Sequence, residues 1–356
     1  GGFSSPEGSW VCRDRTGTES TPAAAVTASD ASSATVTLDA TTLSAGTVCV
    51  LRLTNGDGAY AEFSAVAITN PSSNIEPFLP GTTMGTGRRG LSLVAGRATR
   101  AARFLYALGG DDGSEAGAFD TSESASVDIF GSTGDWFDQP NGLPGPRTLV
   151  QARTLGRFIY LVGGSDGGGA VADVHRAEVL DPGDAPIIED IAVAPAEEGG
   201  MGPGIWYYRV SAVYPASHPT NPGGESLPSD PLVINLPASL PYELVITLFW
   251  SEVDGAESYR VYRSPEPDLA SGSELLLAEV LATEPRELVD DGTVTPAGAS
   301  PLPLGAHGTW VALPSLGTPR AGHGLGHAVD PADPAVHYLY AVGGVDAGGA
   351  SLASYE

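Results

Sequence analysis

One pair of histidines has the residue type and the spacing that could support metal binding. His323 and His327 form a His-x-x-x-His pair, which would share one metal ion if the segment were helical. The glycines of Gly322-His-Gly-Leu-Gly-His327 favour a strand instead, and four residues of strand span about 13 Å. Bonds from a ligand to a metal are only about 2 Å long. We therefore predict that this pair packs or hydrogen-bonds, and we assign no metal site.

Aspartate-bearing loops are the second candidate for chemistry. Calcium prefers carboxylate and carbonyl oxygens, which residues 111–115, 165–167 and 290–292 contain. Asp- and Gly-rich turns have the same composition, and the roughly six to eight ligands of a dedicated calcium loop are not spaced as required. The turn interpretation is therefore favoured, and calcium binding stays open.

Catalytic and cofactor motifs are not recognisable in the sequence. We find no Ser-His-Asp signature, phosphate-binding loop or paired-carboxylate motif. We therefore assign no catalytic residue and expect no cofactor. Scattered acids and serines leave a catalytic group assembled from distant residues open.

The charge of the chain excludes several classes of partner. Asp and Glu number 43 against 17 basic residues, all of them Arg, which gives a net charge of −26. Nucleic-acid phosphate would repel such a polyanion, and a polybasic membrane patch is missing. No apolar run reaches the length of about 18 residues that a spanning helix needs. We expect neither a nucleic-acid partner nor a membrane span in this segment.

The chain has two cysteines, Cys12 and Cys49, both in strand-like surroundings. A disulfide between them would be unambiguous, and the alternative is two buried free thiols. Low charge and abundant Gly, Ser and Thr are typical of extracellular proteins, where disulfides persist. We therefore predict the disulfide, and a location that is extracellular or at the cell surface.

A repeat becomes visible around three apolar segments that each end in a double glycine. The double glycines are Gly109-Gly110, Gly163-Gly164 and Gly343-Gly344. An arginine lies upstream of each, at Arg89, Arg147 and Arg320. An aromatic ring lies 11, 11 and 10 residues earlier still, at Phe78, Trp136 and Trp310. With a further strand after each Asp-bearing loop, four short strands recur per unit.

This unit resembles the kelch repeat, which implies one four-stranded blade of a β-propeller. In that resemblance the glycines permit a tight turn where blades crowd together, and the Trp fills the wedge between neighbouring blades. Phe78 departs from the pattern by replacing a Trp, and the last unit has no fourth strand. We therefore expect further blades from the same polypeptide or from an adjoining copy. Some kelch propellers host a copper-radical oxidase, but both cysteines of this chain lie outside the repeat.

An insertion separates the second and third units. Successive double glycines are 54 and then 180 residues apart. The strands at 206–214, 246–250 and 256–263 resemble those of fibronectin type III modules, with alternating residues suited to a β-sandwich. The 206–214 strand normally follows the strand that holds Trp250 but here precedes it. We therefore predict a permuted or composite sandwich, after which the Trp310 segment pairs with the strand near residues 177–180.

The first 70 residues carry a third pattern. Residues 34–38 alternate in polarity, and residues 49–58 followed by 61–69 resemble the final strands of immunoglobulin-like modules of bacterial surface proteins. In that resemblance Asn55-Gly56 forms the hairpin turn, where positive φ is required.

Together these patterns predict an all-β protein with kelch-type propeller blades, a partial set, and inserted β-sandwich domains. We expect an immunoglobulin-like module over 1–70, blades over 71–183, a fibronectin type III-like insertion over 184–304 and incomplete blades over 305–356.

The expected function is that of a non-enzymatic structural or adhesive protein. The propeller would serve as an interaction hub and the sandwiches as arms, with protein or glycan partners and possibly copies of the same chain. The alternative is a glycan-binding or carbohydrate-active enzyme whose site lies on the loop face of the propeller. Fold alone does not decide between them, and the lack of convergent chemical residues favours the first.

Overall fold

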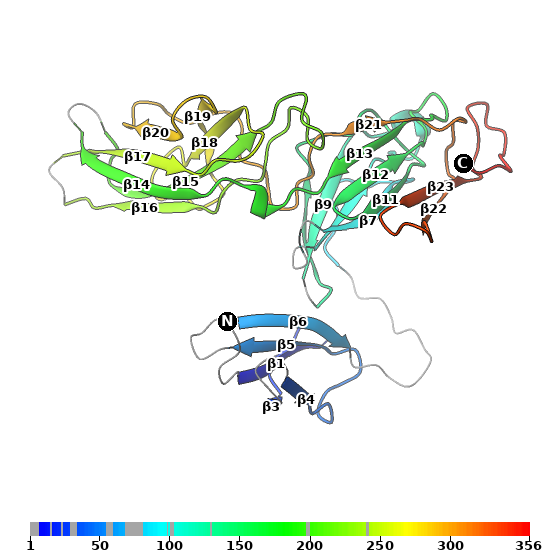
Figure 1. Cartoon of the computed structure of the whole chain (residues 1–356), viewed down its shortest axis with the longest axis horizontal. Coiled ribbons are helices and arrows are strands. Elements are labelled where there is room, and N and C mark those ends of the chain that lie inside the picture. The colour runs from blue at the N-terminus through cyan, green and yellow to red at the C-terminus, as the bar shows by residue number, and fades with distance from the viewer. Residues whose placement is uncertain are drawn as a thin grey trace. The chain divides into compact units, whose positions relative to one another are not determined.

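The computed structural model is all-β, as predicted from the sequence, and it forms several separate antiparallel sheets (Figure 1). It describes residues 7–14, 16–22, 24–28, 34–54, 60–67, 81–97, 99, 103–128, 130–196, 200–239 and 242–356. The chain divides into two compact units, residues 1–83 with 126–135 and residues 84–125 with 136–356. Asn55-Gly56 and Phe78 lie outside the described residues.

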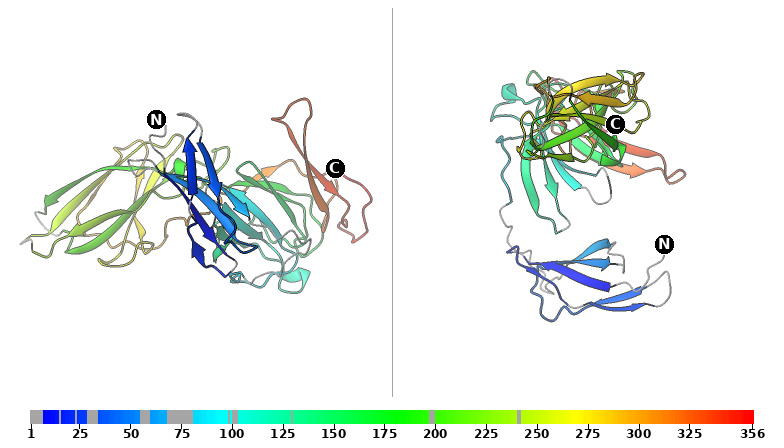
Figure 2. Two further views of the ribbon diagram at one scale, coloured as in Figure 1. Left: turned by 90° about the horizontal axis from the view of Figure 1, so that it is seen from below. Right: turned by 90° about the vertical axis from the view of Figure 1, so that its left-hand side faces the viewer.

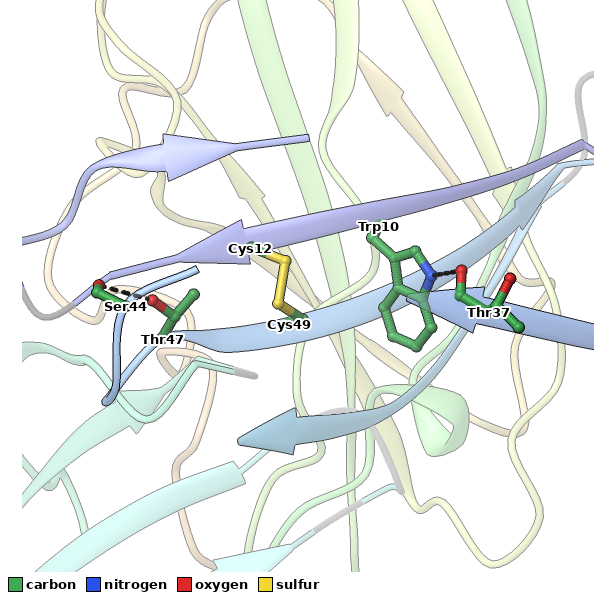
Figure 3. The surroundings of a disulfide bond; sticks show 6 residues. All are labelled: Trp10, Cys12, Thr37, Ser44, Thr47 and Cys49. Atoms are coloured by element: carbon green, nitrogen blue, oxygen red, sulfur yellow. Dashed lines mark hydrogen bonds between the residues drawn. A yellow bond between two sulfur atoms is a disulfide. The ribbon is translucent and has the colours of Figure 1, made fainter. Parts of the chain in front are cut away.

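The N-terminal part of the first unit contains a four-stranded sheet and a hairpin. The sheet order is β2-β1-β5-β6, from β1 (Glu7–Arg13), β2 (Glu19–Ser20), β5 (Val48–Thr54) and β6 (Tyr60–Ala67). The hairpin joins β3 (Ala24–Ala28) to β4 (Ala34–Leu38). Trp10 and the two cysteines form the small buried core between this sheet and the hairpin. Trp10 Nε1 donates to the carbonyl of Thr37 at 3.1 Å (Figure 3).

The predicted disulfide is present in this core. Cys12 and Cys49 face each other across the β1–β5 pair, and their sulfur atoms are bonded at 2.03 Å (Figure 3). Both side chains are fully buried. Alternation along each strand turns both cysteines to the same inner face, so the bond forms without a change of register.

Two four-stranded meanders follow. The first has the order β10-β9-β8-β7, from β7 (Ser92–Arg97), β8 (Arg103–Leu108), β9 (Ser122–Val127) and β10 (Thr133–Asp138), with the short η1 (Glu115–Gly117) between β8 and β9. The second has the order β11-β12-β13-β21, from β11 (Gln151–Leu155), β12 (Phe158–Val162), β13 (Val174–Glu178) and β21 (Val311–Leu313). Phe104, Tyr106 and Leu108 of β8 share one buried cluster with Ile159 and Leu161 of β12.

The insertion predicted from the repeat spacing interrupts the second meander. Val174–Arg176 pair with Val311–Leu313, and Val179 forms a bridge with His307. The Trp310 segment therefore returns to this sheet as predicted, but its strand pairs with residues 174–176, and only the residues just before it contact 177–180. The residues between β13 and β21 leave the sheet and come back to it.

The third repeat unit is a hairpin of β22 (Gly324–Val329) and β23 (His337–Val342), which lies near the C-terminal end (Figure 2). Ala341 and Glu356 exchange backbone hydrogen bonds at 2.9 and 3.0 Å, so the last residues begin to pair with the outer edge of β23.

The inserted residues form two further sheets. One has the order β14-β17-β20, from β14 (Ile188–Pro195), β17 (Leu244–Trp250) and β20 (Glu287–Asp290). The other has the order β16-β15-β18-β19, from β15 (Gly204–Val213), β16 (Leu232–Leu236), β18 (Ser258–Arg263) and β19 (Leu275–Leu281). Buried and half-buried residues alternate along β17, and the inner residues of both sheets join in one apolar core around Trp250, Tyr208 and Val261.

The first glycine of two double glycines lies where the backbone comes close to the next repeat unit. Gly109 has φ +62°, and a Cβ there would lie 2.3 Å from the carbonyl oxygen of Arg147. Gly163 has φ +56°, and a Cβ there would lie 2.5 Å from that of Arg320. A side chain at either position would separate consecutive repeat units, and the positive φ also favours glycine.

Candidate functional site

The arginine expected in the first repeat unit was misplaced by one residue. Bridges pair Arg89 with Asp111 and Thr148 with Ser165, so Arg88, not Arg89, is the counterpart of Arg147. The sequence offers two adjacent arginines, and only strand pairing distinguishes them.

These repeated arginines have structural partners. Arg88 Nη1 donates to the carbonyl of Gly109 at 2.9 Å, and Arg320 Nη1 donates to that of Gly343 at 3.0 Å. Arg88 also pairs with Glu123 at 3.0 Å, with both side chains almost fully buried. The guanidinium groups of Arg88 and Arg320 therefore hold their double-glycine turns in place, whereas that of Arg147 pairs with Asp173 at 2.8 Å.

The aromatic residues of the repeat occupy packing positions. Trp310 packs on the buried cluster shared by β8 and β12, and its ring meets that of His307 edge-on at 5.2 Å. Trp136 lies half-buried in β10. Trp310 therefore lies against residues from both meanders.

The aspartates of the predicted loops have identifiable hydrogen-bond partners. Asp111 accepts hydrogen bonds from Gly113 N and from Thr148 Oγ1, and Asp166 accepts one from Gly168 N. These contacts are those of aspartate turns. Among the described residues, no three acidic, histidine or cysteine side chains gather in a way that could hold a metal ion.

The strand predicted for the His323–His327 segment is present, and it begins at Gly324, one residue after His323. His327 is in β22, and its Nε2 lies 2.9 Å from Nδ1 of His337 on the neighbouring strand. His323 is buried, and a Cβ on Gly344 would lie 2.9 Å from its own Cβ. The two histidines that are close together are therefore not the pair that the sequence spacing suggested.

A pocket of about 620 Å³ lies where the insertion leaves the second meander, and we call it the junction pocket. It lies within the second unit, between the ends of β12 and β13 and loops of the inserted sheets. The polar side chains that line it include those of Arg157, Glu178, Asp184, Tyr214, His218 and Asp254.

The sheet side of the junction pocket is built around an ion-pair network. Arg157, next to β12, contacts Glu178 at the end of β13 and pairs with Asp184 at 3.0 Å. Asp184 ends the short η2 (Pro182–Asp184), which begins where the side chain of Asp181 accepts a hydrogen bond from Gly183 N at 2.8 Å. This turn directs the chain out of the sheet and towards β14.

The insertion contributes an aromatic wall. Tyr214 follows β15, is only 7% exposed, and stacks on His218 with ring centroids 4.3 Å apart. Burial raises the pKa of the Tyr214 hydroxyl to about 12, and the nearby carboxylates of Asp184 and Glu178 add to the effect. The hydroxyl is therefore protonated at neutral pH.

Asn221 locks this wall to the sheet. Its Oδ1 accepts hydrogen bonds from Thr309 N at 2.9 Å and Thr309 Oγ1 at 3.1 Å, and its Nδ2 donates to the carbonyl of Glu225. Its side chain is almost completely buried, beside a small apolar cluster that contains Leu180 and Leu227. The walls of the junction pocket are therefore held by direct contacts.

Sequence reasoning missed Tyr214, His218 and Asn221. The polar loop over 214–229 stands out only because it interrupts two strand patterns, and nothing local shows what it faces.

Comparison with known proteins adds little. No protein-family model and no curated protein sequence matches this chain. A solved structure titled "Structure of YjhT" matches 78% of this chain and 96% of its own, at 11% identity and a TM-score of 0.20. A TM-score this low supports no inference about fold or function.

Proposed function

We propose that this protein is a non-enzymatic structural or adhesive protein of the cell exterior, in which kelch-type propeller blades act as a hub and a fibronectin type III-like insertion acts as a rigid arm. The observation that carries this proposal is the return of the chain to its own sheet. β21 completes the meander that β13 left, and Asn221 bonds the insertion to Thr309 beside it.

Repeated contacts between units support the propeller. Gly110 N donates to the carbonyl of Arg147 at 2.7 Å, and one unit later Gly164 N donates to the carbonyl of Arg320 at 2.8 Å. Each blade of a propeller buries its faces against neighbouring blades, and the shared cluster of Phe104 and Ile159 is a contact of that kind.

Two observations support a permuted fibronectin type III-like sandwich. Its three-stranded and four-stranded sheets share one core, yet β15 and β16 precede β17 along the chain. In the unpermuted order, β20 would continue directly into β15. Gly292 after β20 lies beside Gly200 before β15, since a Cβ on Gly292 would be 2.5 Å from the Gly200 oxygen.

The permutation suits insertion into a blade. The two ends of the insertion are adjacent, because Leu180 N donates to the carbonyl of Ala306 at 3.2 Å. A module with adjacent ends can interrupt a sheet without spreading its strands. The buried Cys12–Cys49 disulfide supports a location outside the reducing cytosol.

Distance measurements between spin labels test the rigid arm. The native cysteines are bonded to each other, so labels attach only at the exposed substitutions Arg153→Cys on β11 and Glu266→Cys on the insertion. We expect a narrow distance distribution that Asn221→Ala broadens. A broad distribution in the parent protein would contradict the rigid arm.

A glycan array and binding to immobilised cell-surface protein test the adhesive role. We expect the protein to bind a glycan or a cell-surface protein and to leave that partner chemically unchanged. Turnover of an array glycan would favour the alternative of a carbohydrate-active enzyme, and it would overturn the non-enzymatic assignment.

A further inference from the structure

The junction pocket has an excess of negative charge. Its lining contains one arginine and the five carboxylates of Glu178, Asp181, Asp184, Glu252 and Asp254. Arg157 is already matched by Glu178 and Asp184. Glu252 lies 3.5 Å from Arg286, and Asp254 has no hydrogen bond or ion pair with any described residue. The pocket therefore has carboxylate that the chain itself does not neutralise.

Tyr214 supplies a second, independent indication of a ligand. Its side chain is more than nine-tenths buried and lines the junction pocket, yet its hydroxyl has no hydrogen-bond partner among the described residues. An N–H group placed in the pocket would donate to the oxygen of this hydroxyl.

The arrangement of the carboxylates indicates the kind of cation. Within the described part of the chain, no three of these groups converge as metal ligands. They are distributed around a volume of about 620 Å³, which exceeds what one ion needs. An elongated organic cation with several N–H donors can reach separate carboxylates.

We propose that the junction pocket binds an organic cation, an ammonium or guanidinium group, carried by a small molecule or by a side chain of a partner protein. The strongly acidic chain attracts such a group from a distance. Because the chain contains no lysine, a second copy could supply a guanidinium side chain but no ammonium side chain. The side-chain source rests on the proposed adhesive function, and the small-molecule source does not.

Calorimetry with the whole chain and N-acetyl-arginine amide tests the proposal. N-acetyl-citrulline amide is the matched probe, since it has nearly the same shape and no charge. We expect the arginine probe to bind at least about tenfold more tightly, and raising the salt from about 20 mM to about 300 mM to weaken it. Equal affinity for the two probes, or no binding of either at millimolar concentration, would overturn the proposal.

Variants locate the binding. Asp254→Asn and Tyr214→Phe should each weaken the arginine probe by roughly five- to tenfold. Glu266→Gln removes the same charge from an exposed position of the insertion outside the pocket and should leave affinity unchanged. Asp254 is exposed, so its substitution should not alter the melting temperature. Equal weakening by Glu266→Gln and Asp254→Asn would mean that the probe senses only overall charge, and would refute the site.

Competition separates the two sources of the cation. If a partner side chain occupies the pocket, agmatine should displace an arginine-rich peptide from the immobilised chain. Binding of agmatine without binding of the peptide would assign the pocket to a small molecule. Either result leaves the spin-label test of the rigid arm unaffected, so the two proposals fail separately.

Discussion

Acidification should weaken the contact between the two meanders through one residue, His307. Its side chain is completely buried beside Ser122 of β9, Tyr106 of β8 and Trp310. Nδ1 donates to the carbonyl of Gly308 at 2.8 Å, which leaves Nε2 to accept from the hydroxyl of Ser122 at 3.3 Å. The backbone N–H of His307 donates to the side chain of Gln139 at 3.0 Å. The neutral ring therefore fits this site, and a protonated ring would have a second N–H facing a hydroxyl in a desolvated place.

The size of the effect follows from linkage between protonation and folding. Burial lowers the pKa of His307 from 6.5 to about 4, although the hydrogen bond to Gly308 acts in the opposite direction. As the pH falls below 6.5, the unfolded chain takes up a proton that the folded chain does not. Stability is therefore lost progressively between about pH 6.5 and pH 4. The loss is about 2 kcal/mol at pH 5 and about 3 kcal/mol below pH 4.

The assay compares urea unfolding of the parent protein and of His307→Gln at pH 7 and pH 5. On acidification the free energy of unfolding of the second unit should fall by about 2 kcal/mol more in the parent than in the variant. His175 and His323, whose pKa values burial also lowers, are present in both proteins and cancel in the comparison. His327→Gln, at a half-buried position in β22, is the control and should behave like the parent. The same pH dependence in all three proteins, or an imidazole NMR titration of His307 near pH 6.5, would refute this reasoning.

Three further changes have expected outcomes. Replacing Cys12 and Cys49 with serine opens a cross-link between residues 37 apart, so the free energy of unfolding of the first unit should fall by about 4 kcal/mol in urea titrations. Asp290→Asn leaves Arg263 buried without its counter-charge at 2.6 Å, and calorimetry should show a loss of about 3–5 kcal/mol that Arg263→Met in the same chain largely restores. Asn221→Ala leaves the half-buried Thr309 N–H unpaired, so stability should fall by about 1–3 kcal/mol and limited proteolysis should cut the loop that carries Asn221; an uncut loop would argue against the contact between Asn221 and Thr309.

Much of the secondary structure and several long-range links could be predicted from local pattern. The disulfide followed from a count of two cysteines, because no other pairing within the chain is possible. The turns at Gly109 and Gly163 followed from residue type, because the positive φ and the close carbonyl exclude a side chain. The return of the chain after the insertion followed from the repeat, because a meander with three strands predicts a fourth.

Other features depended on strands that are distant in sequence. The choice between Arg88 and Arg89 was decided by register, since a shift of one residue turns a side chain to the opposite face of a sheet. The roles of Tyr214, Asn221 and His307 were decided by what packs against them from elsewhere in the chain. The sequence by itself determined strands, turns and covalent links, because these depend on residue type and near neighbours. Only the tertiary structure decided where the junction pocket lies and which groups in it lack a partner, because burial and the shift of a pKa depend on atoms that come together when the sheets pack.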